Sequence, residues 1–180
     1  TAPSRTAGRG AVNAAGTGTY STVTNVTTLA KLDQTITFLT IANQITTNTV
    51  TLAATASSGL PVTFSVSSGP GSIAGGTNLT FTGAGTVRVV AAQAGDADYA
   101  AAATTNSVVV TKAWATVTLG SLSHTYDGAS HAATATTEPA GLTVDMTYDG
   151  VGTAPTAGGS YAVTGTVNDV MYQGVATDTL

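Results

Sequence analysis

Apolar and polar residues alternate at period two through much of the chain. The clearest run has Val62, Phe64 and Val66 alternating with Thr63 and Ser65. The same alternation recurs at residues 36–38, 50–54, 79–82, 87–89 and 108–110. Successive side chains of a strand point to opposite faces of a sheet, so this period predicts strands with one apolar and one Thr-rich face.

Short stretches rich in Gly, Pro, Ser and Asp separate these runs. They lie at residues 57–59, 68–71, 75–76, 83–85 and 95–96. No segment keeps apolar residues at the 3.6-residue spacing of a helix over three turns. Six or seven strands at this close spacing, joined by turns, predict one Ig-like antiparallel β-sandwich over residues 33–112.

A second series of strands starts near Trp114. Its alternating runs and Asp-Gly turns lie at residues 117–119, 126–128, 142–150 and 161–167. This series predicts a second, shorter Ig-like sandwich over residues 113–180. The fold class expected from the sequence is therefore all-β, with two tandem Ig-like antiparallel β-sandwiches preceded by an N-terminal extended strand segment.

The two predicted sandwiches repeat one another. Segments 53–62 and 132–144 both carry Ala-Ala-Thr-Ala, followed by Gly-Leu, one further residue and Val. Asp96 and Tyr99 are likewise spaced as Asp169 and Tyr172 are. Self-similarity of this kind is the mark of a repeat architecture.

The boundaries of the repeat are more informative than its middle. Residues 110–119, where the first domain runs into the second, share their pattern with residues 29–38 at an offset of 81. By that analogy, the N-terminal extension 1–32 contains, at about 22–31, the last strand of a preceding domain that is not in this chain. The second domain reaches only Leu180, and we expect it to lack part of its last strand.

These motifs resemble a known bacterial family. Segments 34–38, 54–70, 83–87 and 94–99 look like the Ig-like modules called MBG domains. The second module, with Tyr-Asp-Gly at 126–128 and 148–150, is similar to the YDG variety of that family. The resemblance implies Ig-like sandwiches strung in tandem in large secreted or surface proteins of bacteria, and it implies no catalytic residues.

Composition narrows the function classes. Charged residues are 8% of the chain, with five Lys and Arg and a net charge of −4, so clustered cations for nucleic acid are absent. Absence of Cys excludes disulfides, thiol chemistry and Cys-ligated zinc, and no apolar run approaches the length of a membrane span. Few Lys and Glu with much Thr, Gly and Ala suit an extracellular or cell-surface bacterial protein.

Two clusters are candidates for a metal site. His124 and His131 flank Asp127, but two imidazoles and one carboxylate on turns lack the supporting shell that a metal needs, so loop or strand-end positions are favoured. Asp96 and Asp98 are weak calcium candidates, since calcium takes six to eight oxygen ligands. A turn in which Asp bonds its own backbone is favoured there. We expect no catalytic residue, cofactor or metal.

The tyrosines of the Tyr-Asp-Gly turns offer a binding alternative. The favoured interpretation packs Tyr126 and Tyr148 on the sandwich edge while Asp-Gly reverses the chain. Aromatic faces also stack on sugar rings, so a carbohydrate-binding role for these tyrosines is the alternative. An enzyme is the least favoured class, because nothing in the sequence pairs a nucleophile with a base.

The leading hypothesis joins the strand-like extension to the unfinished domain. Residues about 17–31 of one subunit would complete the second domain of its neighbour by strand addition, with the register left open. Repetition of this head-to-tail contact gives an open filament. The candidate interface residues are Val23, Val26, Leu29 and Leu180.

Two rival functions stay open. The chain can be an excerpt of a giant tandem-repeat surface protein, in which the extension closes the previous domain of the same polypeptide. It can also be an adhesin or carbohydrate-binding Ig-like module, whose loops at one end hold a ligand. The expected partners are other copies of the chain or surface glycans, with no nucleic acid and no membrane span.

Overall fold

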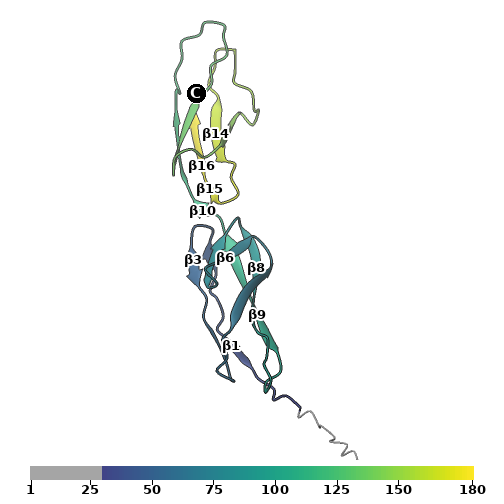
Figure 1. The fold of residues 1–180 in the computed structure, drawn as a ribbon. Coiled ribbons are helices and arrows are strands. Elements are labelled where there is room, and N and C mark those ends of the chain that lie inside the picture. Colours follow the sequence, from purple (N-terminus) through teal and green to yellow (C-terminus); the bar gives the residue numbers. More distant parts are fainter. Residues whose placement is uncertain (1–29) are drawn as a thin grey trace, which may run out of the picture. The chain divides into compact units, whose positions relative to one another are not determined.

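The computed structural model describes residues 30–180, which are all-β (Figure 1). No helix occurs in this range, so the expected fold class, a sandwich-like all-β protein, is confirmed. Residues 31–180 form one compact unit. We call residues 30–112 the first half and residues 113–180 the second half. The interface candidates Val23, Val26 and Leu29 lie outside the described residues.

The first half contains three sheets of short strands. Its strands are β1 (Ile36–Phe38), β2 (Gln44–Ile45), β3 (Thr49–Thr51), β4 (Ala54–Ala56), β5 (Thr63–Ser68), β6 (Gly71–Ala74), β7 (Asn78–Phe81), β8 (Gly85–Gln93) and β9 (Ala102–Thr111). The spatial orders are β2-β9-β8-β5, β3-β7-β6 and β1-β4. The β8–β9 pair is antiparallel over nine residue pairs and is the longest strand pairing in this half.

The second half repeats this plan with fewer strands. They are β10 (Ala113–Trp114), β11 (Thr116–Gly120), β12 (Thr134–Glu138), β13 (Val144–Tyr148), β14 (Ala162–Val167), β15 (Tyr172–Gln173) and β16 (Val175–Thr179). The orders are β13-β14-β16, β11-β12 and β10-β15. Here β14 pairs with β13 on one side and with β16 on the other.

The alternating residues fill the cores as their period predicts. In β8, Val87, Val89 and Ala91 are buried while Arg88 between them is exposed. The first half has one continuous cluster, made of Leu52, Leu79, Phe81, Val87, Val89, Val108 and Val110. Removing this much apolar surface from water is the main stabilising contribution to the half.

The core of the second half is divided into two smaller clusters. Ala115, Val117 and Val167 form one, and Ala133, Tyr148 and Val163 form the other. Gly165 lies between Val163 and Val167 on the inward face of β14. A Cβ at Gly165 would lie 3.0 Å from Leu119 Cδ2 and 3.1 Å from Met146 Sδ, so neighbouring side chains fill the space that an inward side chain would occupy.

The structure departs from the sequence-based expectation in two places. The run 50–54 is interrupted, because Leu52 turns into the core between β3 and β4. Two short pairs, β2–β9 and β10–β15, are parallel where an antiparallel sandwich was expected. Period-two alternation reports which face is buried and carries no information about strand direction.

The two halves share one strand register. Ile36 pairs with Ala56 in the first half, and Val117 pairs with Thr137 in the second, an offset of 81 on both strands. Phe64 pairs with Ala91, and Met146 with Gly165, which aligns β8 with β14 at an offset of 74. The sequence repeat is therefore also a repeat of hydrogen-bonded pairs.

The same comparison aligns the last strand of each half. Ala91 pairs with Thr104, and Gly165 pairs with Ala176, so β16 follows β9 at an offset of 72. Strand β16 packs against β11 as β9 packs against β1. The two last strands are therefore equivalent, although β9 has 10 residues and β16 has 5.

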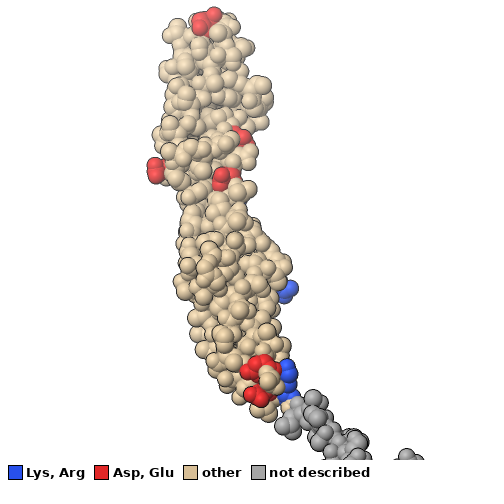
Figure 2. Space-filling model, in the orientation of Figure 1, with Lys and Arg blue, Asp and Glu red and all other residues tan. Residues whose placement is uncertain are grey.

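Charged side chains are sparse on the surface. Figure 2 shows a face on which Lys, Arg, Asp and Glu are few, with acidic and basic side chains lying together only at one end. Nothing within residues 30–180 is a helix of the length and apolarity needed to cross a membrane.

Candidate functional site

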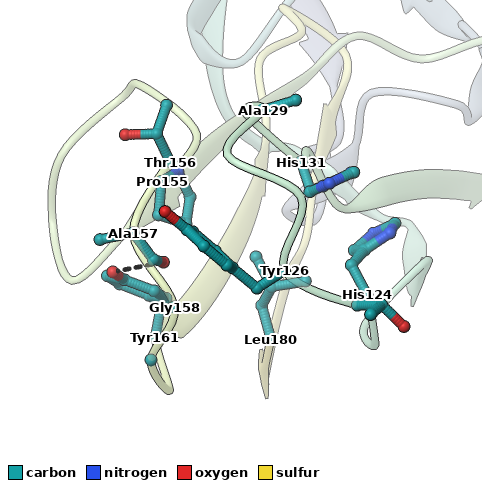
Figure 3. A pocket seen from close by; sticks show the side chains of 12 residues that line it. His124, Tyr126, Ala129, His131, Pro155, Thr156, Ala157, Gly158, Tyr161 and Leu180 are labelled. Atoms are coloured by element: carbon teal, nitrogen blue, oxygen red, sulfur yellow. Dashed lines mark hydrogen bonds between the residues drawn. The ribbon is translucent and has the colours of Figure 1, made fainter.

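A small pocket lies in the second half, next to Leu180. Two loops and the chain's last residue line it, and its volume is about 80 Å³. Residues 124–131 come from the loop between β11 and β12, and residues 155–161 from the loop before β14. Figure 3 shows Tyr126 between the two histidines on one side and the 155–158 loop on the other.

The two histidines of the chain meet at this pocket. The rings of His124 and His131 are stacked, with centroids 4.5 Å apart and 14° between their planes. His131 Nε2 lies 2.8 Å from Asp127 Oδ1. The backbone N–H of Ala129 and, after it, the His131 imidazole hold the pKa of Asp127 below its ordinary value, because both stabilise the carboxylate. The sequence placed these residues near one another but did not predict the stacking.

The ring nitrogens of this group have backbone and carboxylate partners. His124 Nε2 lies 2.9 Å from the carbonyl oxygen of Ser121, so its contact is with its own loop. Within residues 30–180 no group of three His, Asp or Glu side chains is placed to hold a metal ion. The contacts of the histidine pair therefore lie within the 121–131 loop itself.

The two tyrosines of the Tyr-Asp-Gly turns have opposite environments. Tyr148 is 5% exposed, and its phenol oxygen accepts a hydrogen bond of 2.8 Å from the backbone N–H of Ala133. Tyr126 is 70% exposed and lines the pocket. Tyr148 is therefore a core residue, and Tyr126 is the tyrosine of this pair that a ligand can reach.

The Asp96 loop is built as an Asx turn. Asp96 Oδ1 accepts hydrogen bonds from the backbone N–H groups of Tyr99 at 2.8 Å and Asp98 at 2.9 Å. Those two bonds hold the pKa of Asp96 below its ordinary value. Asp169 makes the equivalent turn in the second half, with Met171 and Tyr172. The Asp96 carboxylate that was weighed as a calcium ligand is thus engaged by its own backbone.

The pocket lies beside a backbone pair that extends the β14–β16 ladder. Tyr161 and Leu180 exchange two backbone hydrogen bonds, each 3.0 Å long. At the offsets of 74 and 72, this pair is equivalent to Val87 and Val108 of the first half. Leu180, the remaining interface candidate, packs against the cluster of Ala133, Tyr148 and Val163.

In the first half, the β8–β9 ladder includes two pairs beyond Val87 and Val108. Val109 pairs with Thr86, and Val110 pairs with Gly85 on one side and with Gln44 of β2 on the other. Val110 is 2% exposed and closes the core. This end of β9 fills the place that corresponds to the pocket of the second half.

The segments that flank the pocket have free backbone groups. Thr125 is equivalent to Gln44, and Gly159 and Ser160 are equivalent to Gly85 and Thr86. None of Thr125, Tyr126, Gly159 and Ser160 has a backbone–backbone hydrogen bond to another residue of the described range. Such N–H and C=O groups can receive an extended segment. Neither loop alternates in hydrophobicity, so only the offset of the repeat relates these residues to the first half.

Comparison with known proteins bears on the second half. No curated protein matches the chain. Residues 115–180 match the family model described as MBG domain, which supports an MBG domain over these residues.

Proposed function

We propose that the chain is a non-catalytic structural subunit of an extracellular or cell-surface bacterial fibre. Subunits join head-to-tail, because the N-terminal strand segment of one copy completes the second half of its neighbour. The observation that supports this proposal is the shared register of the two halves, in which Leu32 and Ala113 make equivalent parallel pairings at the start of each half.

The connection between the halves supports a strand role for the N-terminal segment. Strand β9 leads directly into β10, whose Ala113 pairs in parallel with Tyr172. Leu32 makes the equivalent parallel bridge with Tyr99. In sequence, residues 22–31 therefore precede the first half as β9 precedes the second, which supports a role for them as a last strand.

The geometry of such a contact is heterologous. The donor segment precedes the first half, and the acceptor pocket lies in the second half, so one copy uses both surfaces at once. A heterologous contact whose rotation does not close gives an open filament. Strand addition supplies main-chain hydrogen bonds for affinity and side-chain pockets for specificity.

The family match and the surface composition support the location and the non-catalytic role. MBG domains are repeat modules of bacterial surface proteins, and residues 115–180 match that family. A surface with few charges and many Thr, Ser and Gly residues suits contacts between copies. That residues 33–112 form a related module, and that the second module is of the YDG variety, are parts of the same proposal.

Truncation tests the proposal. We expect the full chain to form filaments visible by electron microscopy, and a chain that starts at Ala30 to remain monomeric. The truncated chain keeps Leu32 and its bridge to Tyr99, so its first half stays complete. A chain in which residues 1–16 alone are removed is the matched control, and it should still assemble. Filaments formed by the chain that starts at Ala30 would refute strand donation.

The rival in which one long polypeptide carries many such units has its own test. There, the residues that complete each sandwich belong to the same chain. The intact mass of the natural protein separates the two: about 17.6 kDa supports the subunit, and a far larger mass supports the tandem array.

Carbohydrate binding is a second candidate, favoured by the exposed Tyr126 beside the stacked histidines. A flat aromatic face at a pocket rim is suited to stacking on a sugar ring. A glycan array tests it: saturable binding that is lost in Tyr126→Ala and kept in Tyr161→Phe would support the candidate. Absence of saturable binding to any glycan would dismiss it.

A further inference from the structure

We infer that the free edge of β5 in the first half pairs with the same edge of a second copy of the chain. The two strands run antiparallel about a two-fold axis at Phe64, so that two four-stranded sheets join into one. This inference goes beyond the proposed fibre, because the contact is between copies that lie side by side. It uses no residue of the N-terminal extension.

Strand β5 lies at the edge of its sheet. The order of that sheet is β2-β9-β8-β5, and within residues 30–180 the one strand that pairs with β5 is β8. The N–H and C=O groups on the other side of β5 are therefore open to a further strand. The opposite edge is partly covered, because β2 pairs with the end of β9 and Asn106 of β9 donates to the carbonyl oxygen of Phe38 in β1.

The inward side chains at the β5 edge are incompletely covered. Val62, Phe64 and Val66 are half-buried, whereas Val87 and Val89 of the neighbouring strand β8 are fully buried. Phe64 and Val66 pack against the buried cluster of the first half. An added strand removes more of their apolar surface from water, which favours the contact.

The β5 edge carries no charged side chain. In the sequence, no Asp, Glu, Lys or Arg occurs between Asp33 and Arg88. Charged residues on an edge strand normally oppose its pairing with another chain. The outward side chains of Thr63 and Ser65 are exposed and neutral, so two copies can bring them together without like-charge repulsion.

The equivalent edge of the second half is charged. The pairings of β5 with β8 and of β13 with β14 align Met146 with Phe64, so Asp145 stands where the first half has Thr63. Asp145 is exposed, and its carboxylate accepts a hydrogen bond of 2.9 Å from Asn168 Nδ2. The second half thus has a charge of the kind that protects an edge strand, and the first half lacks it. Between the two equivalent edges, β5 is the one available for pairing.

The residues around this edge limit how a second strand can add. Pro61 has no N–H to donate, and an irregularity in the register of β5 follows Val66. The regular part of the edge is therefore residues 62–66, with Phe64 in the middle. An antiparallel partner of the same sequence places Phe64 opposite Phe64 and Val62 opposite Val66. Apolar side chains then meet apolar side chains, which is why a second copy fits this edge.

A single contact of this size is weak. The paired segment is short, and a two-stranded pairing by itself is marginally stable in water. Free chains in dilute solution are therefore expected to stay monomeric. The contact becomes persistent where many copies are held together, as along a fibre, because the individual pairings then act jointly. Covalent trapping is suited to detecting such a contact.

Disulfide trapping tests the pairing in the full chain, which has no cysteine of its own. The inferred register places Thr63 of one copy opposite Ser65 of the other, within disulfide range. A mixture of Thr63→Cys and Ser65→Cys chains should give about tenfold more mixed dimer than an equal mixture of Thr86→Cys and Arg88→Cys chains. The control residues are exposed and have the same spacing, but they lie on β8, between β5 and β9 in the sheet.

Charges at the same two positions test the register. The Thr63→Cys chain also receives Ser65→Lys, which faces residue 63 of the Ser65→Cys chain. In that second chain, Thr63→Asp should give about fivefold more mixed dimer than Thr63→Lys, because opposite charges attract across a strand pair and like charges repel. Equal yields from the two variants would contradict the placing of Thr63 opposite Ser65.

The outcomes separate this inference from the proposed function. A yield of mixed dimer no greater than that of the β8 control would overturn edge pairing, and filaments formed by the same chains would leave strand donation standing. Cross-links specific to the β5 edge in chains that form no filaments would support edge pairing and count against the fibre.

Discussion

In the first half, Val110 is buried and pairs with Gly85 and Gln44, whereas in the second half a pocket lies beside the equivalent residues Gly159 and Thr125. Both halves use the same register in their β1–β4 and β11–β12 pairs. The difference between them is therefore local. It teaches that an internal repeat lets corresponding positions of two sandwiches be compared pair by pair.

The hydrophobic core of the second half is also smaller than that of the first half. Seven buried residues form a continuous cluster in the first half, while the second half has two clusters of three. Gly165 interrupts the inward row of β14 where the first half has Ala91. We expect the second half to be the less stable of the two, and the predictions below test that contrast.

Truncation of a core residue in the first half should have the largest effect. Leu79 is fully buried, so Leu79→Ala leaves a cavity and should lower the free energy of unfolding by about 2–5 kcal/mol. Val163→Ala, at a fully buried position of the second half, removes two methyl groups and should cost less. Urea denaturation followed by Trp114 fluorescence and circular dichroism measures both. Equal losses would mean that each carbon atom removed costs more in the second core, which would contradict its weaker packing.

Crowding at Gly174 should disturb the entry of β16. A Cβ at Gly174 would lie 2.3 Å from the carbonyl oxygen of Ala115, so Gly174→Ala forces backbone to move and should cost about 1–3 kcal/mol. Gly152→Ala is the matched control, because nothing lies within 4 Å of a Cβ there. Thermal unfolding of the two variants reports the difference. A Gly174→Ala chain as stable as the control would show that the β10–β15 region carries no tight packing.

The two Tyr-Asp-Gly tyrosines should respond differently to loss of the phenol oxygen. Tyr148→Phe leaves the buried N–H of Ala133 without a partner and should cost about 1–3 kcal/mol. Tyr126→Phe, at an exposed side chain, should change stability by less than about 0.5 kcal/mol. Chemical denaturation at one pH compares them directly. A neutral Tyr148→Phe would place the Ala133 N–H in contact with water.

The Asp96 turn should give the smallest effect, visible only as a pH dependence. Its pKa is lower in the folded chain than the unfolded value of about 3.9. The stabilisation from this carboxylate is therefore present above that unfolded value and is lost as the pH falls through the folded pKa. Asp96→Asn should remove this part of the acid dependence. Identical acid unfolding curves for the two chains would show that the turn contributes nothing.

Much of the fold follows from the sequence for a simple physical reason. Burial of one sheet face imposes period two, so runs such as 62–66 and 87–89 predict β5 and β8 directly. The repeat offset of 81, read from residues 29–38 and 110–119, reappears as an identical pairing register. Short edge strands such as β2 and β10 were missed, because two residues carry no period.

The candidate site was less accessible to prediction. Its lining comes from two loops without alternation, and the stacking of His124 on His131 depends on how the 121–131 loop folds back. Tyr126 and Tyr148 stand in the same local motif, yet one is exposed and the other buried, since only Tyr148 lies within a strand. The motif specifies the turn, and the packing of the surrounding strands decides whether the tyrosine side chain is buried or exposed.

The most direct test of the account is to remove the N-terminal segment and follow assembly by static light scattering. The full chain is compared with a chain that starts at Ala30, whose first half keeps the Leu32–Tyr99 bridge. We predict that the full chain assembles and that the shortened chain stays monomeric. Equal assembly of the two chains would contradict donation of the N-terminal strand.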